Sequence, residues 1–223
     1  MKARTLFLVV LAGCCFAVSS PLAAEWSYTG DLQIARSYHT ATLLKDGKVL
    51  IAGGGELKAE LYNPNTGGFS LTGSTKKSFY QGSSATLLPD GRVLLAGGIN
   101  SQKYAEIYDP ASGVFTPTDS LATDHCFHTA TLLADGRVLI AAGQHKQGPQ
   151  THAVAEIYDP ATGAFTTTGS LLTDRSGHAA ALLPDGRVLI AGGVQTTTPG
   201  FGIGLRSCEI FSPGSGLFTA AAD

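Results

Sequence analysis

The chain has 223 residues, a formal net charge of −2 and a pI of about 6.3, and 14% of its residues are charged. It has no basic cluster, which argues against a nucleic-acid partner. Beyond residue 24 no apolar run is long enough to span a bilayer, and residues 25–223 suit a single β domain.

Residues 1–24 have the features of an export signal. Positive charges precede an apolar run at residues 6–18, and residues 19–24 resemble a cleavage region. An LAGC motif ending at Cys14 also resembles a bacterial lipobox, which would leave the protein lipid-anchored through this cysteine. The apolar residues that follow Cys14 favour an ordinary signal peptide. Both interpretations predict an exported protein, periplasmic or extracellular.

One repeat of about 45 residues then occurs four times, which is typical of a propeller-type β array. Each copy begins with a segment such as HTATLLKDGKVLIAGG, starting at His39, Ser83, His128 and His178. Its two short apolar runs predict strands joined by Asp-Gly, a strong signal for a two-residue hairpin turn with positive φ. These turns are Asp46-Gly47, Asp90-Gly91, Asp135-Gly136 and Asp185-Gly186.

Each repeat continues with a third strand resembling AEIYDP and a fourth strand that carries an aromatic residue. Four antiparallel strands make one propeller blade. The third strand has one glutamate in every repeat: Glu60, Glu106, Glu156 and Glu209. Because they recur, we interpret them as structural carboxylates bonded to backbone N–H groups and not as acid catalysts.

The two faces of such an array are predicted to differ. The Asp-Gly and Asp-Pro turns share one face (the turn face) and have nearly constant lengths, whereas the loops on the opposite face (the loop face) lengthen along the chain. Variable loops on a rigid frame are the usual place for binding. The candidate ligand-binding residues on the loop face or its rim are Arg36, Tyr38, His39, Tyr80, His125, His128, His145, His152, Arg175, His178 and Arg206.

The six histidines fall into two groups. His39, His128 and His178 hold equivalent places in three repeats, which favours a structural role. The others, His125, His145 and His152, break the repeat and are better individual candidates for a ligand. Cys126 and Cys208 fall in different strand types of neighbouring repeats, which favours separate thiols.

The double glycines after the second strands (Gly53-Gly54 in the first repeat), the Glu-x-Tyr strand and the fourth-strand aromatic resemble Kelch repeats. The segments SYHTATLLKDGKVLIAGG and YQGSSATLLPDGRVLLAGG are most similar to the Kelch propeller of galactose oxidase and glyoxal oxidase. The resemblance implies an all-β propeller of four-stranded Kelch-type blades. This fold hosts both enzymes and binding scaffolds.

The resemblance also implies one alternative function, a copper radical oxidase. Tyr80 then matches the family's crosslinked tyrosine, and Tyr38-His39 matches its paired ligands, a donor set suited to Cu(II). The family's cysteine has no counterpart in the preceding repeat, and its last histidine comes from a domain absent from this sequence. Some exported Kelch propellers act on sialic acid, but no residue here indicates that activity.

The sequence therefore favours a non-catalytic, exported module that binds a protein or carbohydrate ligand through its loop face, with no cofactor. The loops at 144–152 and 195–206 offer amides, hydroxyls and cations for this purpose. Nothing resembles Ser/His/Asp catalysis, a phosphate loop or a closely spaced metal motif.

The start of the mature chain bears on ring closure. The segment EWSYTGDLQIAR from Glu25 aligns with AFTTTGSLLTDR from Ala164, so an extra outer strand precedes four complete repeats. One strand too many for a closed four-bladed ring predicts an open or strained array, or a fragment of a longer propeller. Such an array is expected to self-associate through its end blades.

Overall fold

A computed structural model describes residues 27–145, 150–198 and 201–221. The predicted signal segment, residues 1–24 with Cys14, lies outside these ranges. The described residues form eighteen β-strands and no helix, so they contain no helix that could cross a membrane. The all-β prediction is confirmed to that extent.

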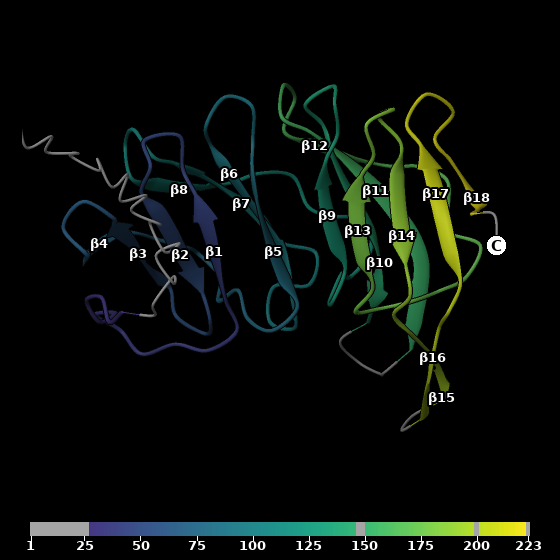
Figure 1. The fold of residues 1–223 in the computed structure, drawn as a ribbon, viewed down its shortest axis with the longest axis horizontal. Helices are drawn as coiled ribbons and strands as arrows, with labels where there is room; N and C mark the ends of the chain where they lie inside the picture. The colour runs from purple at the N-terminus through teal and green to yellow at the C-terminus, as the bar shows by residue number, and fades with distance from the viewer. Residues whose placement is uncertain (1–26, 146–149, 199–200, 222–223) are drawn as a thin grey trace, which may run out of the picture.

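Sixteen strands form four antiparallel sheets, and within each sheet strands adjacent in the meander pair (Figure 1). Blade 1 contains β1 (His39–Leu43), β2 (Val49–Gly53), β3 (Lys58–Asn63) and β4 (Gly68–Ser74). Blade 2 contains β5 (Ser83–Leu87), β6 (Val93–Gly97), β7 (Ala105–Asp109) and β8 (Val114–Pro117). Blade 3 contains β9 (Thr129–Leu132), β10 (Val138–Gln144), β11 (Thr151–Asp159) and β12 (Ala164–Thr167). Blade 4 contains β13 (Ala179–Leu182), β14 (Val188–Ala191), β17 (Cys208–Ser212) and β18 (Leu217–Ala220).

The remaining two strands, β15 (Val194–Thr198) and β16 (Phe201–Gly204), form a hairpin inserted into blade 4. It projects from the array at the lower right of Figure 1 and packs against β11 of blade 3. The sequence predicted a loop from residue 195 to 206, so that prediction is wrong. The polar run of β15 carried no repeat signal, because only one blade has this insertion.

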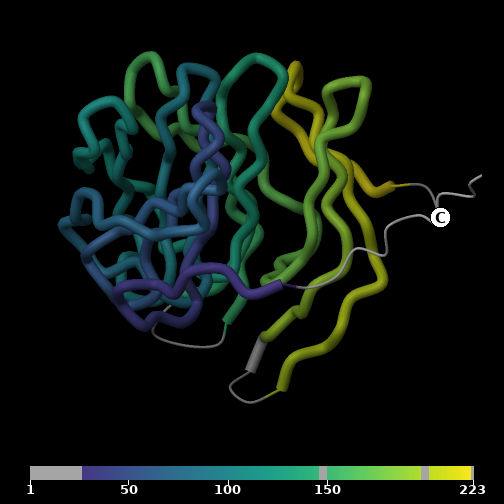
Figure 2. The backbone as a smooth tube through the Cα atoms, turned by 60° about the vertical axis from the view of Figure 1, so that its left-hand side comes forward, coloured from purple at the N-terminus to yellow at the C-terminus, as the bar shows by residue number. Residues whose placement is uncertain are grey.

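The blades lie side by side with their innermost strands adjacent: β1 packs against β5, β5 against β9 and β9 against β13. The end strands β1 and β13 share no such packing in the described part of the chain. The tube in Figure 2 shows the same arrangement from another side. The four blades are thus arranged as in a propeller, and the array is open.

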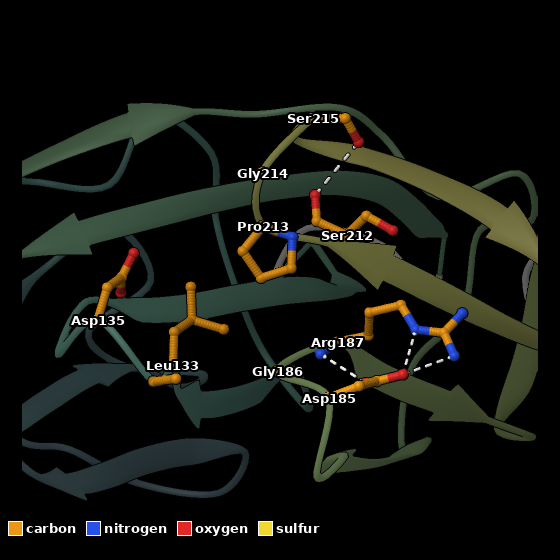
Figure 3. A pocket seen from close by; sticks show the side chains of 10 residues that line it. Leu133, Asp135, Asp185, Gly186, Arg187, Ser212, Pro213, Gly214 and Ser215 are labelled. Atoms are coloured by element: carbon orange, nitrogen blue, oxygen red, sulfur yellow. Dashed lines mark hydrogen bonds and ion pairs between the residues drawn. The ribbon is translucent and has the colours of Figure 1, made fainter.

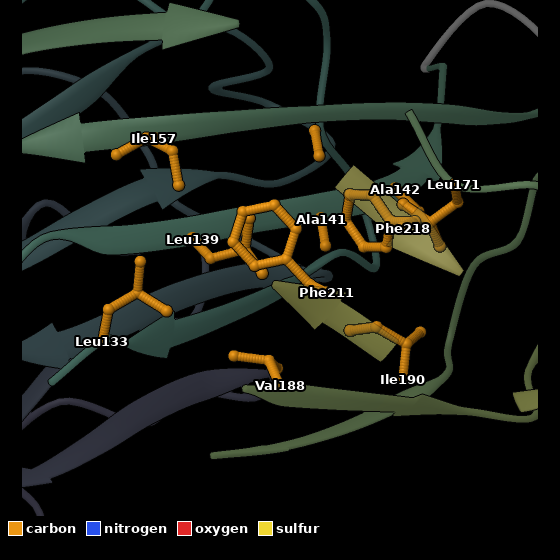
Figure 4. Packing of buried hydrophobic residues seen from close by; sticks show 11 residues of the cluster. Leu133, Leu139, Ala141, Ala142, Ile157, Leu171, Val188, Ile190, Phe211 and Phe218 are labelled. Carbon is orange, nitrogen blue, oxygen red and sulfur yellow. The ribbon is translucent and has the colours of Figure 1, made fainter. Parts of the chain in front are cut away.

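Apolar clusters fill the three spaces between neighbouring blades. Figure 4 shows the cluster between blades 3 and 4, where Leu133, Leu139, Ala141 and Ile157 meet Val188, Ile190, Phe211 and Phe218. All of these side chains are at most 6% exposed. Full burial of one large aliphatic or aromatic side chain stabilises the fold by about 1.5–3 kcal/mol.

The Asp-Gly turns differ from the two-residue turns predicted from the sequence. In blade 1, Leu44 N–H donates to Lys48 O and Gly47 N–H donates to Leu44 O, which closes a three-residue loop. Only the glycine has positive φ, 85° at Gly47, and Asp46 does not. Asp46 instead accepts a bond from the backbone N–H of Lys48. Three-residue hairpin loops with glycine in the left-handed position explain this geometry.

The predicted extra outer strand is also not formed within the described residues, because residues 27–38 contain no strand. They run over blade 1 as an extended segment. Gly30 N–H donates to Gly67 O, and the hydroxyls of Thr29 and Tyr62 are bonded. The alignment with residues 164–175 is nonetheless informative, because Gly169 N–H donates in the same way to Gly216 O of blade 4.

Candidate functional site

The four recurrent glutamates join each blade to the segment that enters it. All four are at most 2% exposed. Glu60 accepts bonds from the backbone N–H groups of Gln33 and Ile34 at 2.7 and 3.1 Å. The other three accept equivalent pairs of N–H bonds from Lys76 and Lys77, from Ala122 and Thr123, and from Leu172 and Thr173. A carboxylate thus secures backbone donors that would otherwise be buried without partners.

In three blades an arginine or histidine side chain pairs with this glutamate. Arg36 contacts Glu60 at 2.9 Å, and Arg175 contacts Glu209 at 2.7 Å. His125 contacts Glu156 at 3.0 Å. The pairs are buried, so these side chains are committed to holding the blades and do not face a ligand.

Both ring nitrogens of His125 are hydrogen-bonded to oxygen atoms. Its Nδ1 lies 2.8 Å from the carbonyl oxygen of Ala142, and its Nε2 lies 3.0 Å from Glu156 Oε1. Both partners are hydrogen-bond acceptors, so the ring connects a backbone carbonyl of blade 3 to the carboxylate of its third strand. His125 therefore has the same structural role as the arginines of blades 1 and 4. Arg36 and Arg175 also bond both the glutamate and a glycine carbonyl of their own blade.

Blade 2 is the exception, because Phe79 occupies the position of the arginine or histidine. Phe79 is 1% exposed and packs in the cluster between blades 1 and 2. Oε2 of Glu106 is buried without a well-formed hydrogen bond, although the Tyr104 phenol lies close to this carboxyl. Burial raises the pKa of Glu106, and the N–H groups of Lys76 and Lys77 oppose that effect only in part.

The equivalent histidines bind across the spaces between blades. His128 Nε2 is bonded to Ser84 Oγ of blade 2 at 2.8 Å, and His178 Nε2 is bonded to Thr129 Oγ1 of blade 3 at 2.9 Å. Burial lowers the pKa of His128 well below its usual value, with the nearby His125 as the next cause. Burial, with the charge of Arg175, lowers the pKa of His178 to about 4. His39 holds the same position in blade 1 but is exposed.

Four histidines gather around blade 3. The ring of His152 lies 4.8 Å from that of His125 and 5.0 Å from that of His145, and His125 lies 5.7 Å from His128. His152 Nε2 donates to the carbonyl oxygen of Asp124, and burial lowers its pKa to about 4. This group is therefore packed in the frame, and only His145 is partly open to solvent.

The residue that precedes the first position of each repeat (His39, Ser83, His128 and His178) has a left-handed backbone. It is glycine in blades 2 and 4, but Tyr38 (φ 58°) in blade 1 and Phe127 (φ 54°) in blade 3. An aromatic residue in this conformation costs on the order of 1–3 kcal/mol. The ring of Phe127 packs on Gly82 of blade 2, where an added Cβ would lie only 3.1 Å from its Cγ. This contact offsets part of the cost. Tyr38 is 58% exposed and forms an edge-to-face contact with Tyr80, with ring centroids 5.3 Å apart.

The structure thus separates the predicted site residues into two groups. Arg36, His125, His128, His152, Arg175 and His178 are bound within the frame. Tyr38 and Tyr80 lie together at the loop-face rim, with His39 next to Tyr38 in the chain. Arg206 is exposed after the β15–β16 hairpin.

Sequence reasoning missed three kinds of residue. Aligning the repeats on Arg36 would have found Phe79, because it is an apolar residue at a position where the other repeats have arginine or histidine. The partners Ser84 and Thr129 share the second position of the repeat, but their contacts depend on how the blades stack. The cluster of Thr151, Asp174 and Gln195, joined by side-chain hydrogen bonds, depends on the β15–β16 hairpin and had no sequence signal.

The turn face carries grooves between neighbouring blades. One of about 460 Å³ lies between blades 3 and 4 and is lined by residues that include Leu133, Asp135, Arg187 and Pro213 (Figure 3). Equivalent grooves between blades 1 and 2 and between blades 2 and 3 are lined by the same turns. Because this groove repeats at each space between blades, it follows from the stacking of wedge-shaped blades and does not single out a ligand.

Comparisons with solved structures support a Kelch-like propeller fold. The chain is similar to a fungal alcohol oxidase of the AA5 family in complex with copper, with 15% identity and a TM-score of 0.52 over 83% of this chain and 53% of that one. It is similar to YjhT, with 12% identity and a TM-score of 0.69 over 84% of this chain and 71% of that one. The chain thus spans about half of the oxidase, and identities this low show the fold alone. No family model and no curated protein matches the sequence.

The residues that would hold copper in the oxidase interpretation do not form a donor set. His128 and His178 direct Nε2 at hydroxyls of neighbouring blades, and His39 is exposed. The described residues contain no group of three or more His, Cys, Asp or Glu placed to hold a metal ion. Copper ligands must converge within about 2 Å of one point, so this arrangement does not fit the centre that the resemblance implied.

Proposed function

We propose that the chain is an exported, non-catalytic recognition module that binds a glycan at the loop-face rim formed by Tyr38 and Tyr80. The observation that carries the proposal is the exposed Tyr38 in a left-handed backbone. Two other blades meet the same backbone requirement with Gly82 and Gly177, at no steric cost. Strain of this kind, where packing does not repay it, clusters at binding sites.

The surroundings suit a polar, ring-shaped ligand. Tyr38 and Tyr80 stand nearly perpendicular, at 81°, so each offers a different surface to a ligand. Tyrosine combines an apolar ring with a hydroxyl that hydrogen-bonds, which matches the mixed surface of a sugar. The neighbouring His39 is exposed and adds ring nitrogens. Export follows from the signal features of residues 1–24, and it belongs to the proposal.

A glycan array followed by calorimetry with the strongest-binding glycan tests this function. Tyr38→Gly should lose binding by about tenfold or more, since a lost aromatic contact of 1.4 kcal/mol already gives that factor. The same variant should keep or raise the melting temperature, because glycine relieves the strained φ. Tyr28→Ala is the matched control, since Tyr28 is fully exposed elsewhere in the chain.

The proposal is contradicted if no glycan binds on the array, or if Tyr38→Gly binds the glycan as tightly as the wild type. It is also contradicted if the purified chain holds about one copper that is lost in Tyr80→Phe while the fold is intact. The last result would favour the oxidase. A protein ligand captured through Tyr38 with no glycan binding would also refute the glycan assignment.

A further inference from the structure

The two ends of the array expose the two halves of the interface that holds the blades together. Each blade packs one face, its leading face, on the next blade. In blade 3 this face consists of Leu133, Leu139, Ala141, Ala155 and Ile157. The trailing face of the next blade receives it, and in blade 4 this face consists of Val188, Ile190, Phe211 and Phe218.

The leading face of blade 4 has no blade against it. Its residues at the same repeat positions are Leu183, Leu189, Ala191, Cys208 and Ile210. They keep the sizes and apolar character of their counterparts in blade 3, yet all five are only half-buried, against at most 6% exposure there. Blade 4 therefore presents a leading face like the one that blades 1 to 3 bury.

Blade 1 presents the complementary half. Its trailing-face positions are Val49, Ile51, Tyr62 and Phe69. Val49, Tyr62 and Phe69 are half-buried, whereas Val93, Tyr108 and Phe115 of blade 2 are at most 2% exposed. Val49 is the clearest of these, because its equivalents Val93, Val138 and Val188 are all 0% exposed in the three interfaces within the chain.

The N-terminal segment already supplies the connection that a preceding blade would make. Thr29 and Gly30 bond Gly67 of blade 1 as Thr168 and Gly169 bond Gly216 of blade 4. A blade that docks on blade 1 therefore needs to supply only its sheet face.

We propose that blade 4 of one chain docks on blade 1 of a second copy, head to tail, and that two copies close into a ring. The occupant is a second copy because its leading face has the residue types that three interfaces within the chain already join. Two chains of four blades fall within the range of known propellers, about 4–8 blades. A heterologous interface that closes forms a ring and leaves no free end.

One contact in the proposed interface is mismatched. His128 and His178 each bond a hydroxyl of the preceding blade, on Ser84 and Thr129. At the new interface His39 would face Ala179, which has no hydroxyl. The association should therefore be reversible and concentration-dependent.

Sedimentation velocity over a range of protein concentrations tests the proposal. The wild-type chain should shift from monomer to dimer, without larger species. Leu189→Asp on blade 4 and Val49→Asp on blade 1 should each weaken dimerisation by about a hundredfold, because each buries an unpaired charge in the interface. Leu217→Asp is the matched control, since Leu217 and its equivalent Val114 are both exposed. Circular dichroism verifies that each variant is folded.

Mixing distinguishes a head-to-tail contact from any other. Each single-face variant alone lacks one half of every interface. A mixture of Val49→Asp and Leu189→Asp chains has one intact interface and should form dimers. A wild-type monomer at all concentrations overturns the proposal. So does a variant that dimerises as well as the wild type, or a mixture that stays monomeric.

A gain of affinity tests the same geometry without risk to the fold. Ala179→Ser places a hydroxyl opposite His39 of the second copy and should tighten the dimer by about threefold to tenfold, the effect of one hydrogen bond. His39→Phe should cancel that gain. An unchanged dissociation constant in Ala179→Ser contradicts the head-to-tail register.

Discussion

Acid should destabilise the fold through His178, and the size of the effect follows from its environment. The side chain is 7% exposed, its Nε2 is bonded to Thr129, and its Nδ1 is buried without a partner. Protonation would place a buried charge near Arg175, so the pKa is lowered to about 4. In the unfolded chain the histidine pKa is about 6.5.

A histidine whose folded pKa is depressed stabilises the fold fully above its unfolded pKa and loses this contribution as the pH falls toward 4. Between pH 7 and pH 5 the linkage relation gives a loss of about 2 kcal/mol in the free energy of unfolding. His152 should add a loss of similar size, because its pKa is also lowered to about 4.

Urea unfolding at pH 7 and pH 5 measures the effect. His178→Gln retains an amide that can bond Thr129 but does not titrate, so its loss should be smaller than that of the wild type by about 2 kcal/mol. His39→Gln is the matched control at the equivalent, exposed position, and its loss should equal that of the wild type. Equal losses in the wild type and His178→Gln would show that His178 carries no burial penalty.

Two further predictions concern the frame. Glu209→Gln should lower the free energy of unfolding by about 3–5 kcal/mol, because it leaves the charge of Arg175 buried and unpaired. Glu106→Gln should lower the free energy of unfolding by less, since no cation pairs with Glu106. The wild type should lose stability as the pH rises through the raised pKa of this carboxyl, and Glu106→Gln should not show that loss. Denaturation of both variants at several pH values checks this, and equal costs would contradict it. Replacing Gly91 (φ 95°) or Gly136 (φ 89°) by Val should cost on the order of 1–3 kcal/mol in calorimetry. Gly214→Val, where φ is not positive and nothing lies within 4 Å of an added Cβ, should change little, and a melting temperature unaffected by Gly91→Val would disprove the role of positive φ.

The repeats made the blades predictable because each strand and turn has its own local chemistry. The Asp-Gly turns mark the hairpins even though the loops have three residues, and the apolar runs beside them form strands as expected. The recurrence of Glu60 and its equivalents likewise indicated a structural carboxylate. These features depend on residues close in sequence or on repetition, and both are visible in a single chain.

What the sequence left unpredicted depends on the stacking of one blade on another. His39 and His178 occupy the same place in the repeat, but His178 has a blade beside it and His39 does not. The β15–β16 hairpin occurs once, so no repeat could indicate it, and its polar strand lacks the apolar alternation of the blades.

The two faces of the array have opposite responses to acid. On the turn face, Asp90, Asp135 and Asp185 each pair with an arginine two residues later, and their pKa values are lowered. These carboxylates keep their charge as the medium becomes acidic. On the loop face, burial lowers the pKa values of His152 and His178 to about 4, so these rings resist protonation in mild acid. Mild acid therefore leaves the surface charge of the turn face intact, while the loss of stability arises on the loop face, from the histidines buried in blades 3 and 4.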